Sequence, residues 1–136
     1  MAVLRDTIAP MNCLATLKIA LLMSFFTALA SAQLNVELYR QSVARGGNAE
    51  QVAKAYLGGA GLALGAANAV LTANHQRLLY CAPEKLPLNV GNMESIIYDW
   101  IREMSKATPV EVIEKLPVAT VLLNAMIDAF PCPVKP

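Results

Sequence analysis

The sequence predicts an all-α protein, a small bundle of four to five helices with one intramolecular disulfide. Three observations support this fold class. Apolar residues recur at the spacing of an amphipathic helix in several segments, no segment carries the signals of a strand hairpin, and two cysteines follow an N-terminal targeting segment. No internal repeat or low-complexity tract interrupts the pattern, so residues 33–136 are expected to form a single helical domain.

The N-terminal residues have the organisation of a secretory signal peptide. Lys18 precedes the uncharged run of residues 19–30, and Ala30-Ser31-Ala32 has the small-residue pattern of a cleavage site. We therefore expect residues 1–32 to be removed after Ala32, with Met11 as an alternative start of translation. A retained membrane anchor is the alternative, but an apolar run of twelve residues is short for a membrane span. The expected destination is the bacterial periplasm, and full secretion stays open.

The charge balance of the predicted mature chain excludes one group of partners. Without Arg5, Lys18 and Asp6, the basic residues fall from 11 to 9 and the acidic residues from 10 to 9, which leaves a net charge of zero. There is no basic excess to attract nucleic acid or anionic lipid, so neither is expected as a partner, and no membrane contact is expected after removal of the signal peptide.

Two cysteines, Cys81 and Cys132, remain in the predicted mature chain. An even number of cysteines in an oxidising compartment favours a disulfide over reactive thiols, and only one pairing is possible within the chain. A disulfide between Cys81 and Cys132 would close a loop of about fifty residues, which is expected to stabilise the folded state by about 4 kcal/mol.

The segment Ala55–Ala73 contains no charged residue and four glycines. Its length passes the threshold for a membrane span, and Gly61 and Gly65 have the spacing of a membrane dimerisation motif. However, it contains only five large aliphatic residues, which contribute about −2 kcal/mol of insertion free energy in total. We favour a helix of a soluble domain, with a membrane span as the alternative.

On a helical projection this segment has a small polar face and an opposite apolar face. Leu57, Leu64 and Leu71 recur every seven residues and predict a seam for other helices. Glycines on an exposed helix face are destabilising, so we expect a close approach there by another helix, within the monomer or across a homodimer. The residues of the small face are Lys54, Gly58, Gly61, Gly65, Asn68 and Thr72.

Shorter amphipathic segments flank the glycine-containing helix. A helix is expected around Glu37–Ala44, followed by a turn at Gly46-Gly47 and a restart at Asn48 with Gln51 as its capping-box partner. After the predicted loop 82–91, apolar residues from Met93 to Met104 follow helical spacing, with Trp100 in the buried stripe.

Two further helices are predicted near the C-terminus. Thr108 as N-cap, Pro109 in the first turn and Glu111 as capping-box residue predict a short helix that ends or kinks at Pro117. A last helix runs from Pro117 to about Phe130 and is expected to be the most buried element, because its polar residues lie on one narrow line.

The sequence offers no legible catalytic set. His75 is the single histidine, and no Ser–His, Cys–His or clustered-carboxylate arrangement can be assembled. One histidine and two oxidised cysteines cannot complete a zinc site. We therefore expect a protein that is not an enzyme and that needs no metal or other cofactor.

Three motifs together resemble the Rap/Tai-like immunity proteins. They are GLALGAANAV (Gly61–Val70), YCAP (Tyr80–Pro83) and AFPC (Ala129–Cys132), and their order and separations also agree with that family. The resemblance covers Ala55–Cys132. It implies a small helical periplasmic protein that inhibits a peptidoglycan amidase effector delivered by type VI secretion.

The chain departs from the family pattern at several positions. Many members have a second cysteine pair that this chain lacks, and the family's usual tyrosine and aspartate are Leu62 and Asn68 here. The target is therefore less firmly implied than the fold, because function depends on sites and not on the fold alone.

The expected function is that of a binding module that holds a loop in the active site of a partner enzyme. The loop 83–92, or the turn 107–109, is expected to reach that partner. A homodimer joined partly through Gly58, Gly61 and Gly65 is also expected. The alternative is a non-catalytic envelope structural or accessory protein. The loop residues assigned to partner binding are Pro83, Glu84, Lys85, Asn89 and Asn92.

Overall fold

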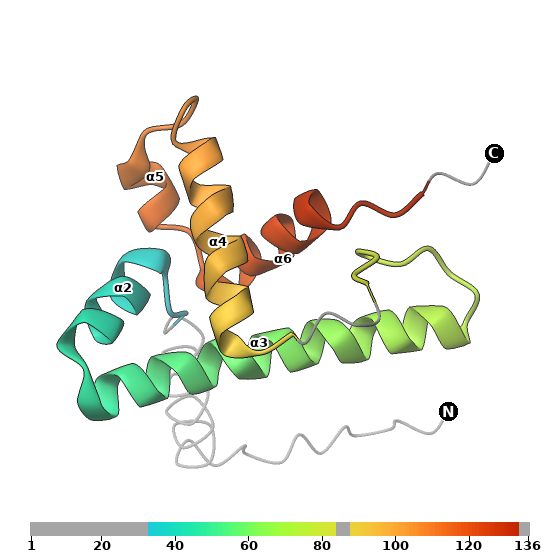
Figure 1. The fold of residues 1–136 in the computed structure, drawn as a ribbon, viewed down its shortest axis with the longest axis horizontal. Helices are drawn as coiled ribbons and strands as arrows, with labels where there is room; N and C mark the ends of the chain where they lie inside the picture. The colour runs from blue at the N-terminus through green and yellow to red at the C-terminus, as the bar shows by residue number, and fades with distance from the viewer. Residues whose placement is uncertain (1–32, 84–87, 134–136) are drawn as a thin grey trace, which may run out of the picture. The chain divides into compact units, whose positions relative to one another are not determined.

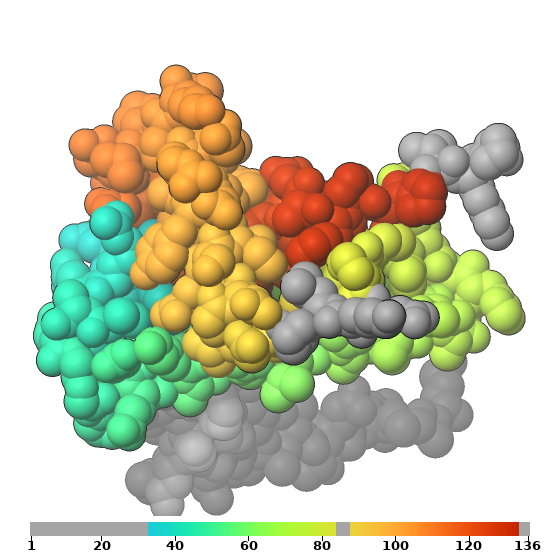
Figure 2. Space-filling view, in the orientation of Figure 1, coloured from blue at the N-terminus to red at the C-terminus, as the bar shows by residue number. Residues whose placement is uncertain are grey.

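A computed structural model describes residues 33–83 and 88–133, and the predicted signal peptide lies outside the described residues. The described chain is all-α and contains the Cys81–Cys132 disulfide, so the predicted fold class is confirmed. Helices α4 and α6 lie on the same side of the long helix α3 (Figures 1 and 2). The elements are α2 (Val36–Arg45), α3 (Gly47–Ala73), α4 (Val90–Met104), α5 (Val110–Glu114) and α6 (Val118–Ala129).

Two glycines join α2 to α3. Gly46 has a φ of 71° and Gly47 a φ of 58°, and this left-handed region favours glycine because it has no Cβ. The predicted turn is therefore present. However, α3 begins at Gly47, and no side chain caps its N-terminus, so the capping box predicted from Asn48 is wrong. The tight turn fixes the direction of α3 without a polar cap.

Helix α3 is the longest element, with 27 residues and a length of about 40 Å. It ends in a Schellman motif in which the His75 amide donates to Thr72 O and the Gln76 amide donates to Leu71 O. His75 has a φ of 54°, a position that glycine usually occupies. This motif reverses the chain, which then returns alongside the C-terminal part of α3.

The core lies where α4 and α6 cross α3, and α6 contributes the largest share of it. Thr120, Asn124 and Asp128 form the exposed polar line of α6, as the sequence pattern predicted. The other sides of this helix are largely buried. The fully or nearly fully buried apolar residues are Val36, Tyr39, Ala53, Leu57, Tyr80, Met93, Ile97, Ile101, Ile113, Val118, Val121, Leu122, Ala125 and Met126.

The start of α2 is joined to the segment between α5 and α6 by a short antiparallel bridge. The Val36 amide donates to Leu116 O at 3.1 Å, and the Val118 amide donates to Leu34 O at 2.9 Å. Helix α5 begins at Val110 with Pro109 as an N-cap that makes no side-chain hydrogen bond. The predicted N-cap at Thr108 is therefore wrong. The Thr108 amide, which the predicted capping box would pair with Glu111, donates to Met104 O and closes the turn after α4.

Candidate functional site

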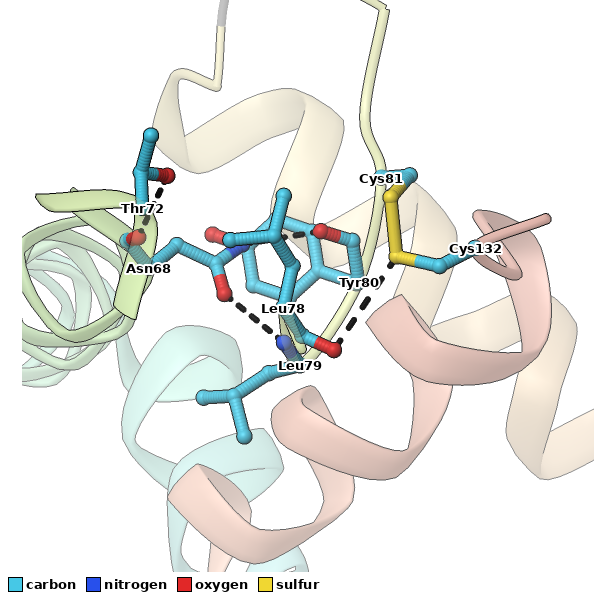
Figure 3. The surroundings of a disulfide bond; sticks show 7 residues. All are labelled: Asn68, Thr72, Leu78, Leu79, Tyr80, Cys81 and Cys132. Atoms are coloured by element: carbon cyan, nitrogen blue, oxygen red, sulfur yellow. Dashed lines mark hydrogen bonds between the residues drawn. A yellow bond between two sulfur atoms is a disulfide. The ribbon is translucent and has the colours of Figure 1, made fainter. Parts of the chain in front are cut away.

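The predicted disulfide closes one end of the molecule. Cys81 and Cys132 are bonded with their Cα atoms 4.9 Å apart, and the Cys81 amide donates to Phe130 O at 2.8 Å. The bond therefore attaches the segment after α3 to the segment after α6 (Figure 3). We call residues 76–81 the strap, because they run from the end of α3 to the disulfide.

Asn68 holds the strap against α3. Its side-chain amide donates to Tyr80 O and its side-chain oxygen accepts from the Leu79 amide, both at 2.9 Å (Figure 3). Tyr80 is buried, and this burial raises the pKa of its phenol. This role of Asn68 was not predictable, because the strap has no regular pattern that places Leu79 opposite Asn68.

The predicted partner-binding loop follows the disulfide directly. Pro83 is exposed, whereas Glu84 and Lys85 lie outside the described residues. At the far end of the loop, the exposed Asn89 is the N-cap of α4, and its Oδ1 accepts from the Asn92 amide at 2.9 Å. The loop is therefore anchored on one side by Cys81 and on the other side by a helix cap, and Asn89 has a structural role as well.

The three glycines assigned to helix packing or dimerisation have different surroundings. A Cβ on Gly61 would overlap the Sδ and Cε atoms of Met93 on α4, and a Cβ on Gly58 would lie 3.3 Å from Val90 Cγ2. Gly65 has open space around it. Gly58 and Gly61 therefore pack against α4 within the chain, and the expected dimer cannot use them without displacing α4.

A groove of about 270 Å³ lies between α4 and α6. Its rim carries the carboxylates of Asp99, Glu103 and Asp128, and the Trp100 indole N–H donates to Asp128 Oδ2 at 2.8 Å. Trp100 was predicted to be a core residue, but it is only partly buried and forms one wall of this groove. Its partner on α6 could not be anticipated, because α4 and α6 are separated in the sequence.

The chemistry of the described residues gives no positive indication of a reaction. No group of three histidine, cysteine, aspartate or glutamate residues in residues 33–83 and 88–133 is arranged to hold a metal ion. His75 is exposed at the C-terminal end of α3, where its backbone completes the Schellman motif. The surface features that the structure describes are the two anchors of the loop and the groove between α4 and α6.

Comparison with known proteins adds no assignment. No protein-family model, no curated protein and no solved structure matches this chain.

Proposed function

We propose that this protein is a periplasmic immunity protein that inhibits a peptidoglycan amidase effector of type VI secretion by occluding its active site. The observation that carries the proposal is the loop between Cys81 and Asn89, which is anchored by a disulfide on one side and by the N-cap of α4 on the other. Loops carry function when a rigid scaffold positions them.

The anchors make this loop suited to inhibition. A loop whose ends are already fixed loses less conformational entropy when it docks than a loop with free ends, so more of the contact energy is available as affinity. Occlusion requires shape and contact but no catalytic group. This agrees with a chain in which no nucleophile and base can be paired from the sequence.

Two features of the sequence support the location and the target. The N-terminal run that ends in Ala30-Ser31-Ala32 is typical of export to the compartment where peptidoglycan is cleaved. The motifs Gly61–Val70, Tyr80–Pro83 and Ala129–Cys132 resemble those of amidase immunity proteins. N-terminal sequencing of the protein purified from periplasm is expected to begin at Gln33.

The test is co-expression of the full chain in the periplasm with the secreted amidase candidate from the neighbouring reading frame. We expect protection from lysis and co-purification of the two proteins. Exchange of the loop charges, Glu84→Lys with Lys85→Glu, is expected to weaken both effects. The matched control exchanges Arg40 and Glu114, which form an ion pair between α2 and α5 away from the loop and the groove, and should leave protection intact.

A folded protein that neither protects cells nor co-purifies with the amidase would contradict the proposal. The accessory-protein function would then be favoured. One observation supports this second candidate, namely the exposed apolar side of α3, because exposed apolar patches mark surfaces used in assembly.

A further inference from the structure

The groove between α4 and α6 combines apolar walls with an acidic rim. The loop proposed to block the amidase follows Cys81, and none of its described residues lines the groove. The groove is therefore a separate surface, and its own chemistry indicates what it binds. Its apolar lining residues are Ile96, Trp100, Met104, Ala125 and Ala129.

Trp100 is held in a fixed position at this groove. It lies on α4, and its indole N–H donates to Asp128 Oδ2 on α6 at 2.8 Å. The side chain is only partly buried, so part of the ring stays open to an incoming group. A ring that is already fixed loses little conformational entropy when a partner docks, and tryptophan is enriched among the residues that dominate binding energy.

All the charges that line the groove are negative. Asp99, Glu103 and Asp128 line it, and no basic residue does. Asp99 pairs with Arg102 and Glu103 with Lys106, but these pairs are exposed, and exposed ion pairs contribute little. Asp128 has no ion-pair partner among the described residues. The groove therefore presents a negative charge that the described chain does not neutralise.

The position of these carboxylates at helix ends strengthens the negative potential. Glu103 lies in the last turn of α4, which ends at Met104, and Asp128 lies in the last turn of α6, which ends at Ala129. The C-terminal end of a helix carries partial negative charge and favours cations. A carboxylate there is unfavourable for the helix itself, so a bound cation would relieve repulsion at both helix ends.

We propose that the groove between α4 and α6 binds an arginine side chain of a partner protein. The guanidinium stacks on the Trp100 indole and donates hydrogen bonds to the carboxylates of Asp128 and Glu103. The alkyl part of the arginine packs against the apolar walls. The charge of the occupant thus complements the rim, and its stem complements the floor of the groove.

The size and the charge of the groove favour arginine over other occupants. Its volume of about 270 Å³ lies just below the roughly 300 to 1,000 Å³ of ordinary small-molecule pockets, so it suits a single side chain. No group of three acidic, histidine or cysteine side chains in the described residues could hold a metal ion, whereas a guanidinium reaches several acceptors through five donors in a planar fork.

A neutral sugar could also stack on Trp100, but it would leave the nearby carboxylates partly desolvated without an opposite charge. The cation is therefore the better match. This inference goes beyond the proposed inhibition of an amidase and does not depend on it, because the groove and the described part of the loop have no residue in common.

The test uses the full chain, expressed and purified from periplasm. Trp100 is the single tryptophan of the chain, so its fluorescence reports on the groove. The probe is the end-blocked tripeptide leucyl-arginyl-leucine, titrated to about 20 mM, and we expect a dissociation constant in the millimolar range. The matched peptide carries citrulline, which replaces the guanidinium by a neutral urea group, and should bind about tenfold more weakly.

Two matched variants locate the charge. Asp128→Asn keeps an oxygen that can accept from the indole but removes the charge, and it should raise the dissociation constant of the arginine peptide about fivefold to tenfold. Glu37→Gln removes the same charge from an exposed position on α2 and should leave the affinity unchanged. Thermal unfolding verifies that both variants are folded.

Three outcomes would overturn the proposal. The first is equal affinity for the arginine and citrulline peptides, or no response to either. The second is a folded Asp128→Asn variant that binds the arginine peptide as tightly as the wild type. The third is a fluorescence response to chitotriose without a response to the arginine peptide, which would assign the groove to a glycan.

Discussion

The two halves of α3 are held to the rest of the chain in different ways. In the N-terminal half, Ala53, Leu57 and Gly61 are buried against other helices. Beyond Gly61 no α3 residue is buried. The partly buried Leu64 packs against the core there, and the two hydrogen bonds of Asn68 and the disulfide-bonded strap add specific attachments. Apolar burial secures α3 where helices cross it, and a few specific bonds secure it where only an irregular segment lies alongside.

This difference determines how each half responds to change. Apolar burial is spread over many atoms and tolerates volume-conserving substitution. The C-terminal half depends more on single groups of Asn68, Cys81 and Cys132, so the loss of any one of them should weaken its attachment.

Removal of the disulfide is expected to have the largest effect. Changing Cys81 and Cys132 together to serine should lower the free energy of unfolding by about 2 to 5 kcal/mol, because the unfolded chain regains the freedom of a long loop. Urea denaturation measures the change, and wild-type protein in reductant is the control. If reductant leaves the midpoint of the wild type unchanged, the disulfide does not secure this half.

Asn68→Asp should lower the free energy of unfolding by about 1 to 3 kcal/mol at neutral pH, because an ionised carboxylate cannot donate to Tyr80 O. A protonated carboxyl can donate, so the deficit should shrink as the pH falls toward about 4, the ordinary pKa of aspartate in the unfolded chain, and should stay constant below it. Urea denaturation across this pH range measures it. Asn68→Ala is the control, and its deficit should not change with pH in this way. Equal pH profiles for the two variants would contradict the assigned hydrogen bond.

Alanine substitutions at two glycines compare the covered and open sides of α3. Gly65→Ala should stabilise the protein by up to about 1 kcal/mol, because the site is open and alanine favours a helix. Gly61→Ala should instead be destabilising by about 1 kcal/mol, since the new methyl group must displace the buried Met93 side chain. Thermal unfolding of both variants measures the difference, and equal shifts would show that α4 does not pack closely on Gly61.

Tyr39→Phe tests the core that also buries Ala53 and Leu57 of α3. It should cost about 1 kcal/mol, because it removes the 2.6 Å hydrogen bond from Tyr39 Oη on α2 to Glu94 Oε1 on α4. Burial, followed by this bond, raises the pKa of Tyr39 above its ordinary value of 10.0. The unfolded state therefore loses this proton first, and the contribution of Tyr39 to stability falls as the pH rises above about 10. The variant should lose less stability than the wild type over that range in alkaline urea titrations.

Features set by local pattern were accessible from the sequence. The stripe from Met93 to Met104 predicted α4, Gly46-Gly47 predicted the turn before α3, and the count of cysteines predicted their pairing. The stripe and the turn depend on residues close in sequence. The cysteine pairing has one possible outcome, because only two cysteines follow the predicted signal peptide. They predicted the fold class and the disulfide that anchors one end of the loop.

Features that depend on contacts between distant segments were missed. The missed features are the bond from Asn68 to Tyr80, the bond from Trp100 to Asp128 and the contact of Met93 with Gly61. They all depend on where distant segments meet, which the periodicity of a helix does not specify. The Thr108 cap was wrong because α5 begins one residue later than predicted, with Pro109 as its N-cap. The exposed apolar side of α3 was missed because its alanines carry a weak pattern signal.

The bridge between Asn35 and Pro117 has a consequence for the order of folding. Most helical proteins fold quickly because their contacts join residues that are near in sequence. Here two backbone hydrogen bonds join the start of α2 to the segment just before α6, so forming them closes a loop that spans most of the described chain. Refolding should therefore be slow for an all-α domain, and a fragment that ends before Pro117 should lose both bonds while α2 keeps its packing on α3.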